Sequence, residues 1–175
     1  MLKNGLDVER QTAMQVAELM AAAARTAPKG CGIDNIEVRL VDGKEKDDLA
    51  EELRRIGKET GVDFFVRDGH NIDAAIVVVL LGARISPIYC PNCGFCGYED
   101  CDDNKAHEGI CMFNSTDLGI ALGSAVSVAS AHKIDNRILF SAGRGALNLG
   151  YFPPEVKLVY GIPLSISSKN PFFDR

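Results

Sequence analysis

TDLGIALGSAVSVASAHK, residues 116–133, is the stretch around which the rest of this chain must pack. It is apolar on nearly every side and dense in alanine and glycine. That composition predicts a central helix whose backbone approaches its neighbours closely. Ser115 or Thr116 is a suitable N-cap, because a hydroxyl oxygen can accept a hydrogen bond from a backbone N–H of the first turn.

Hydrophobic periodicity predicts the elements on either side of this helix. The expected elements are helices over 7–26 and 46–59, strands over 36–41, 76–81, 136–140 and 156–165, and a short helix or loop over 141–150. Residues 62–73 are ambiguous because they contain the turn-like pair Asp68-Gly69. Pro163 suggests that the last strand ends at a sheet edge. The pattern is α/β or α+β, with long helices packed against a sheet.

Length and composition limit the class of protein. A chain of 175 residues, 46% apolar, fits one domain over 1–175, with a small module at 86–113 inserted in it. The net charge of −5 and the lack of a basic run argue against nucleic-acid binding. The longest apolar run, 74–83, is too short to span a bilayer, and the N-terminus lacks the apolar core of a signal peptide. We expect a cytoplasmic protein that does not bind membranes.

Five of the six cysteines fall in one short stretch, CPNCGFCGYEDCDDNKAHEGIC. They are Cys90, Cys93, Cys96, Cys101 and Cys111. In a reducing compartment, clustered cysteines serve metal or redox chemistry more often than structural disulfides. The stretch is rich in Gly, Asn and Asp and has no apolar core, so we expect a bound metal to supply its order.

The spacing of these thiols is typical of an iron–sulfur cluster, which four thiolates usually hold. Two ligand sets are open: Cys90 with Cys93, Cys96 and Cys101, or the last three with Cys111. Structural zinc is the alternative, although zinc sites usually separate two cysteine pairs by a dozen or more residues. Cys31 lies apart in the sequence, and we expect it to be a small buried hydrophobic residue. His107 could ligate a metal, but the thiolates suffice in number.

Part of this stretch resembles a known cofactor-binding domain. CGFCGYEDC, followed by an Ala-His-Glu-Gly turn and Cys111, looks like the four-cysteine Fe–S domain of electron-transport and carbon-monoxide-dehydrogenase proteins. That resemblance implies a 4Fe–4S cluster and favours the set that includes Cys111. The last gap is shorter here than is usual in that domain.

The scaffold resembles the nitroreductase-like flavoprotein fold in three places. AAAARTAPKGCGIDNIEVRLV is similar to that family's first helix, Ala-Pro loop and first strand, TDLGIALGSAVSVASAHKI to its central helix, and LNLGYFPPEVKLVYGIPLS to its closing segment. Together with the cysteine insert and the tail KNPFFDR, the chain most resembles the DUF2148 family of ferredoxin-domain proteins. The resemblance implies an α+β (α/β), three-layer sheet-and-helix domain that carries a small metal-binding insert.

The nitroreductase resemblance also implies FMN bound at a homodimer interface. The implied contacts are Arg10, Lys169 and Arg175 for the phosphate, Pro28, Lys29 and Gly30 for the ring or ribityl chain, and Ser141, Ala142 and Gly143 for the other side of the ring. Guanidinium groups suit the first role because they fork onto phosphate oxygens. The sequence departs from the family at its start, where Arg10 alone replaces the usual arginine-rich entry.

Three functions are consistent with these features. The first is a cytoplasmic redox protein with an iron–sulfur cluster and FMN, which passes electrons to a partner protein or reduces a small acceptor. As an enzyme, it would be a flavin-dependent oxidoreductase of nitroreductase type. The second is a cluster-only electron-transfer or sensing module without catalytic activity. The third is a zinc-stabilised binding protein. Motifs of serine hydrolases, P-loop NTPases and His-Glu-x-x-His metalloproteases are missing from the sequence.

Overall fold

The computed structural model describes residues 2–173, which form four strands and several helices. The helices are α1 (Gly5–Thr26), the one-turn 3-10 helix η1 (Gly30–Gly32), α2 (Gly43–Thr60), α3 (Asp63–Asp73), α4 (Cys101–Ala106), α5 (Met112–Ala131) and α6 (Phe140–Asn148). The strands are β1 (Ile36–Val41), β2 (Val77–Arg84), β3 (Asp135–Asn136) and β4 (Val156–Ser165). None of the helices within residues 2–173 is long and apolar enough to cross a membrane.

The strands form one antiparallel sheet in the order β1-β2-β4-β3. β2 is the apolar run expected to be buried on both faces, and all of its residues except Arg84 are buried. Successive side chains of a strand point to opposite faces. Val77, Val79 and Leu81 therefore enter one core, while Val78 and Leu80 enter the other.

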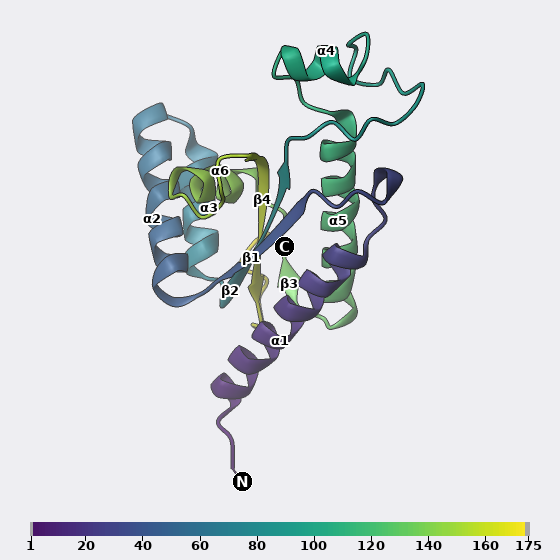
Figure 1. Ribbon diagram of the computed structural model, residues 1–175. Helices are drawn as coiled ribbons and strands as arrows, with labels where there is room; N and C mark the ends of the chain where they lie inside the picture. Colours follow the sequence, from purple (N-terminus) through teal and green to yellow (C-terminus); the bar gives the residue numbers. More distant parts are fainter. Residues whose placement is uncertain (1, 174–175) are drawn as a thin grey trace.

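Helices cover both faces of the sheet, so the fold has three layers (Figure 1). α1 and α5 pack on each other and on one face, where alanines of both helices permit close contact. α2, α3 and α6 cover the other face. The cysteine segment, which we define as residues 85–111, leaves the end of β2 and lies beyond the N-terminal end of α5, with α4 at its outer side (Figure 1). The expected α+β three-layer architecture is confirmed.

The central helix differs from the prediction in two respects. It begins at Met112 and its N-cap is Cys111, so a start at Ser115 or Thr116 is wrong. The first turn is held by tertiary contacts, because the Asn114 side chain accepts a hydrogen bond from the Ser86 N–H at 2.9 Å. The central helix is also not buried on every side within this single chain, since Gly119, Ile120 and Gly123 are exposed.

Two further segments show how tertiary contacts override local signals. Residues 63–73 form a helix, and Gly69 lies within it because a Cβ there would come 2.9 Å from the Ala50 carbonyl oxygen of α2. The expected strand over 136–140 is mostly wrong. β3 ends at Asn136, and Phe140 already starts α6.

Pro163 does not mark a sheet edge. β4 lies between β2 and β3, and Pro163 pairs with Val78. The Gly161 N–H bonds to Leu139 on the β3 side, and by strand periodicity the Pro163 nitrogen faces the same way. Pairing on that side is interrupted between Asn136 and Leu139, so the missing proline donor breaks no ladder hydrogen bond.

Candidate metal centre

All five clustered cysteines line one open hollow of about 580 Å³. The hollow lies between the cysteine segment and the N-terminal end of α5. Its other lining residues include Tyr89, Tyr98 and Phe113. The six cysteines of the chain are all free thiols in this structure. The fold thus gathers at one end of the molecule the residues that the sequence singled out as metal ligands.

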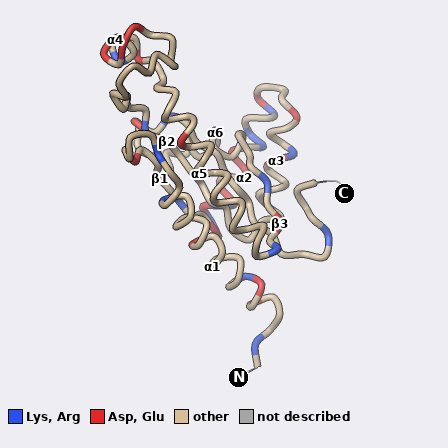
Figure 2. The backbone as a smooth tube through the Cα atoms, turned by 90° about the vertical axis from the view of Figure 1, so that its right-hand side faces the viewer, with Lys and Arg blue, Asp and Glu red and all other residues tan. Residues whose placement is uncertain are grey.

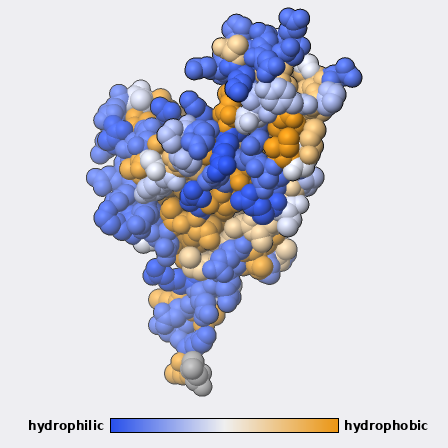
Figure 3. Space-filling model, in the orientation of Figure 1, coloured by the Kyte–Doolittle hydropathy of each residue, from blue (hydrophilic) through white to orange (hydrophobic). Residues whose placement is uncertain are grey.

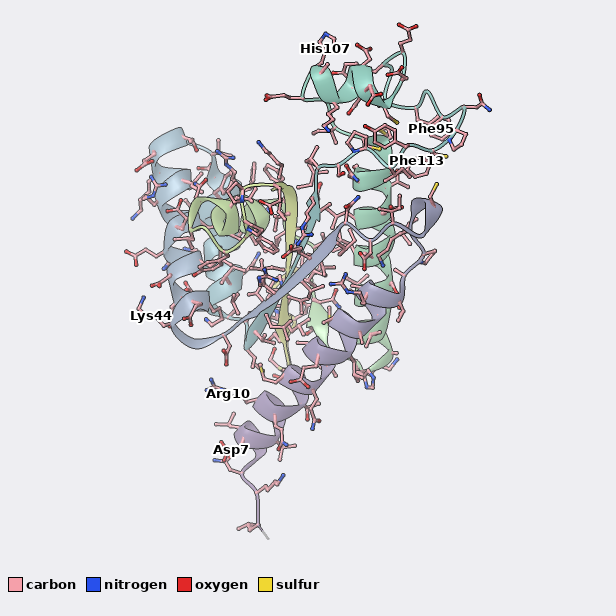
Figure 4. The ribbon with its side chains drawn as sticks, viewed as in Figure 1. Asp7, Arg10, Lys44, Phe95, His107 and Phe113 are labelled. Carbon is pink, nitrogen blue, oxygen red and sulfur yellow. The ribbon has the colours of Figure 1, made fainter. Side chains whose placement is uncertain are left out.

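Hydrogen bonds within the protein order part of the cysteine segment. The Asp100 carboxylate caps α4 by accepting from the Asp103 N–H at 2.8 Å, and the Tyr89 hydroxyl donates to Asp102 at 2.8 Å. The ring of Tyr98 stacks on that of His107, which faces away from the hollow (Figure 4). These caps and this stacking therefore order α4.

Aromatic and glycine contacts anchor the base of the segment to the helical layer. The rings of Phe95 and Phe113 stack with centroids 6.3 Å apart (Figure 4). Gly30 packs so closely beneath them that an added Cβ would lie 2.6 Å from Phe113 and 2.8 Å from Ile88. The Gly30 N–H donates to both carboxylate oxygens of Asp117 at 3.1 Å. The loop after α1 is thus fixed against the cysteine segment.

This loop carries the sixth cysteine to the same place. Cys31 is exposed, so its expected burial as a small hydrophobic residue is wrong. Its backbone is left-handed, with φ of 53°, which is uncommon for a residue other than glycine. Burial, with a smaller effect from Cys31, raises the pKa of the Cys90 thiol. Sequence spacing gave no sign that the Cys31 loop packs against the cysteine segment, because the two lie far apart in the chain.

Cys111 is the most enclosed of the six cysteines. It is the one buried thiol among them, and it occupies the N-cap of the long helix α5. Unpaired N–H groups and the helix dipole make this position favourable for negative charge.

The clustered cysteines are suitable ligands for a metal or cluster, although the cysteine segment is too open to hold one in this arrangement. Within residues 2–173, no three Cys, His, Asp or Glu side chains are close enough together to hold one metal ion. Asn104, only 1% exposed, leaves both its amide nitrogen and oxygen without a partner among the described residues, and the Asn114 amide nitrogen is also unpartnered. Buried amides of this kind usually have partners. The segment therefore holds enough thiol groups for a cluster, and the two unpartnered asparagines lie outside the lining of the hollow.

Acidic residues dominate the outer part of the cysteine segment (Figure 2). Between Cys90 and Cys111, Lys105 is the one lysine or arginine. The five acidic residues there are Glu99, Asp100, Asp102, Asp103 and Glu108. The outer part of the cysteine segment is therefore negatively charged.

The positions implied for FMN do not gather at one place. Arg10 is largely exposed and pairs with Asp42 at 3.5 Å (Figure 4). Pro28 lies eighteen residues further on, about 27 Å along the axis at the usual helical rise. Lys29 donates three hydrogen bonds of 2.6 to 3.0 Å to carbonyl groups at the end of α1. Within this chain it caps a helix.

The second group lies on the opposite face of the sheet. Ser141, Ala142 and Gly143 are buried in α6, and the Ser141 hydroxyl donates to the Asp68 carboxylate at 2.6 Å. Gly143 packs directly on the Val159 carbonyl group of β4. These positions hold α6 against α3 and the sheet.

Lys169 is exposed, and sequence reasoning missed its neighbours. It lines an open hollow of about 590 Å³, which we call the basic hollow, together with Arg67 of α3 and Arg137. The Arg137 guanidinium donates to the Phe172 carbonyl group at 2.8 Å. Arg175 lies outside the described residues. No motif links these cations in the sequence, since they come from three separate segments.

Comparison with known proteins places the chain in a family. A family model described as "Uncharacterized protein containing a ferredoxin domain (DUF2148)" matches residues 107–175, which include Cys111. An uncharacterized protein of Archaeoglobus fulgidus is 38% identical over 183 aligned positions, covering 100% of this chain and 98% of that protein. The chain belongs to the DUF2148 ferredoxin-domain family.

Solved structures share the fold at low sequence identity. The hypothetical oxidoreductase YcnD of Bacillus subtilis superposes with a TM-score of 0.59 and 18% identity, over 90% of this chain and 59% of YcnD. An FMN-dependent nitroreductase of Clostridium difficile superposes with a TM-score of 0.58 and 16% identity, over 89% of this chain and 76% of the nitroreductase chain. This chain therefore has a nitroreductase-like fold, and it spans 59% of the length of YcnD.

Proposed function

We propose that this protein is a redox protein that binds a four-iron cluster through Cys93, Cys96, Cys101 and Cys111. The observation that carries the proposal is the convergence of the clustered cysteines on one hollow at the N-terminus of α5. Membership of a ferredoxin-domain family supports it. When bound, such a cluster would accept and release single electrons.

Two features favour Cys111 over Cys90 as the fourth ligand. Cys111 is buried and is the N-cap residue of α5, beside first-turn N–H groups that have no partner within the helix, whereas Cys90 is only half-buried. The open segment would close as its thiolates bind, because metal binding and local folding are coupled. The glycines at 94 and 97, both with positive φ, are suited to that rearrangement.

FMN is the second cofactor we propose, with its phosphate in the basic hollow. Arg67, Arg137 and Lys169 supply positive charge there, and guanidinium groups suit phosphate oxygens. The structural relatives include a protein named as an FMN-dependent nitroreductase. A flavin in addition to the cluster would make the protein a flavin-dependent oxidoreductase that reduces a small acceptor or exchanges electrons with a partner protein.

A cluster-only electron-transfer or sensing module is the second candidate. Its support is the placement of the implied flavin contacts, with Arg10 far along α1 from Pro28 and with Ser141–Gly143 buried on the other face. In this alternative, the cysteine segment would be the one redox site and the protein would have no catalytic activity.

We also propose that the protein is a homodimer formed through α5. The exposed face of that helix carries Gly119, Ile120 and Gly123, and Ile120 is 41% exposed. Figure 3 shows hydrophobic surface over the upper part of α5, next to the hydrophilic cysteine segment. Small residues allow helices to approach closely, so a second copy of α5 is the occupant that suits this face.

The test is anaerobic purification of the whole protein, followed by an absorption spectrum and by iron, zinc and flavin counts on one sample. We expect iron, with a broad band near about 400 nm that bleaches on reduction. Flavin that falls on substitution Lys169→Ala supports the oxidoreductase, and iron without flavin supports the cluster-only module. A colourless protein with stoichiometric zinc and no iron would contradict both.

A further inference from the structure

The buried carboxylate of Asp68 joins α3 to α6 and holds one side chain of the basic hollow. Asp68 is only 3% exposed. Its Oδ1 atom accepts hydrogen bonds from Arg67 Nε at 2.9 Å and from Asn71 Nδ2 at 3.4 Å, while Oδ2 accepts from the Ser141 hydroxyl at 2.6 Å. Arg67 Nη2 also lies 2.8 Å from Oδ1. A buried charge needs such partners, and one of them, Arg67, lines the hollow.

The contact with Asp68 fixes the orientation of the Arg67 guanidinium. Nε and Nη2 are held on the same carboxylate oxygen, whereas Nη1 has no hydrogen-bond partner among the described residues. Because a guanidinium is planar and rigid, holding one edge also fixes the direction of Nη1. Arg144 on α6 provides the contrast, since no hydrogen bond or ion pair holds its side chain within residues 2–173.

A second guanidinium of the basic hollow is also held by an oxygen acceptor. Arg137 Nη1 donates to the Phe172 carbonyl group at 2.8 Å, and the guanidinium carbon lies 4.7 Å from the centre of the Phe173 ring. No carboxylate of the described residues lines this hollow, and Asp68 itself is outside the lining. The hollow therefore combines the positive charge of two arginines and a lysine with guanidinium groups that are ordered before any ligand binds.

We propose that Asp68 is a positioning residue for phosphate binding in the basic hollow. It holds the Arg67 guanidinium ready for the oxygens of a phosphomonoester, while Ser141 holds the carboxylate from α6. Phosphate is the ligand class because ordered guanidinium groups match its oxygens. This role rests on the phosphate site proposed above for FMN, and it adds a residue that does not touch the ligand.

Removing the charge of Asp68 separates positioning from simple attraction between charges. Asp68→Asn takes a negative charge away from the neighbourhood of the hollow, so attraction alone would tighten phosphate binding. Loss of the charge-assisted contact instead frees Arg67, which must then be ordered when the ligand binds. We therefore expect Asp68→Asn to weaken phosphate binding by about tenfold, a loss typical of one hydrogen bond to a charged group.

The experiment uses the whole protein, purified without oxygen and dialysed free of phosphate and flavin. Calorimetric titrations with inorganic phosphate and with FMN give the two affinities, and NMR gives the exchange rate of each arginine Nε–H. In the wild type, the Arg67 Nε–H should exchange more slowly than that of Arg144, and Asp68→Asn should abolish the difference. Arg67→Lys should also bind phosphate more weakly, although it keeps the charge. Asp73→Asn, which removes a charge from the same helix, is the matched control and should bind at least as tightly as the wild type.

The affinities of Asp68→Asn distinguish the positioning role from the flavin proposal. A variant that binds phosphate as tightly as the wild type, or more tightly, would overturn the positioning role and leave FMN binding intact. Phosphate binding without FMN binding would defeat the flavin and keep the positioning role. A wild type that binds neither would overturn both, and its iron content would still test the cluster. If Asp68→Asn does not fold, the wild type decides, because equal Nε–H exchange at Arg67 and Arg144 would overturn the positioning role.

Discussion

Two buried carboxyl groups show how single residues respond to their surroundings in opposite ways. Burial alone would raise the pKa of Glu37, but hydrogen bonds and charges from Arg84 and Arg39 outweigh it and hold that pKa below its usual value. Burial raises the pKa of Asp117, and Asp34 adds to the effect, although the Gly30 N–H and Lys29 oppose it. The first carboxylate ties β1 to β2, and the second ties the Cys31 loop to α5.

Replacing Glu37 by Gln should lower the free energy of unfolding near neutral pH by about 1–3 kcal/mol, because a charge-assisted bridge to Arg84 and Arg39 is lost. A lowered native pKa means that the ionised group stabilises the fold above its unfolded pKa, and that this stability disappears as the pH falls through the native pKa. Urea unfolding of the two proteins should therefore converge on acidification. Glu18→Gln, on the exposed side of α1, is the matched control and should change little. An equal difference at all pH values would contradict this role of Glu37.

Asp117→Asn should show the opposite trend. Because the native pKa of Asp117 is raised, its ionisation costs stability, and this cost appears as the pH rises through the unfolded and then the native pKa. Asparagine carries no charge and can still accept from the Gly30 N–H. Across urea titrations from acid to neutral pH, the variant should gain stability relative to the wild type. A relative loss would show that the charged hydrogen bond outweighs burial.

At the scale of elements, α6 depends on one close approach to the sheet. A Cβ on Gly143 would lie 1.7 Å from the Val159 carbonyl oxygen, so Gly143→Ala must push α6 away from β4. Overpacking of this kind costs about 1–3 kcal/mol, which chemical denaturation would measure. Gly5→Ala, where an added Cβ meets nothing within 4 Å, is the control and should stay within about 1 kcal/mol of wild type. Equal stabilities of the two variants would contradict the packing of α6.

Local signals predicted most elements, and tertiary contacts account for the differences. Periodicity located α1, α2, β1, β2 and β4, because each buries a regular face. It missed the helix over residues 63–73, because the pair Asp68-Gly69 is typical of a turn. In the structure, Gly69 lies within a helix and allows that helix to pack closely on α2. Periodicity extended β3 too far, because Leu139 is the N-cap of α6 and Phe140 its first residue, while Ile138 is exposed.

At the scale of the whole molecule, the exposed face of α5 bears on the proposed dimer. Gly123→Arg should leave the single chain folded, because a Cβ there meets nothing within 4 Å, yet it should prevent a second α5 from approaching. Sedimentation should show a wild-type dimer and a monomeric variant. Gly5→Arg, at the far end of α1, should remain dimeric. A monomeric wild type, or a variant that still dimerises, would contradict the interface.

The candidate site could be predicted from the sequence only where its residues are neighbours in the chain. The clustered cysteines fall in one short stretch, and the fold places all five around one hollow. The loop that carries Cys31 reaches the cysteine segment where Gly30 packs on Ile88, and Arg67 and Arg137 reach Lys169 through the packing of α3 and the chain end. Contacts between distant segments have no local spacing, so periodicity and motifs cannot reveal them.

The most direct measurement is the iron content of the anaerobically purified wild type beside Cys111→Ser and Cys90→Ser. We predict that the wild type carries a four-iron cluster, that Cys111→Ser loses most of its iron and its visible band, and that Cys90→Ser keeps both. Circular dichroism of each variant would confirm that the scaffold is folded. Iron that is absent from the wild type, or retained in Cys111→Ser and lost in Cys90→Ser, would contradict the proposed metal centre.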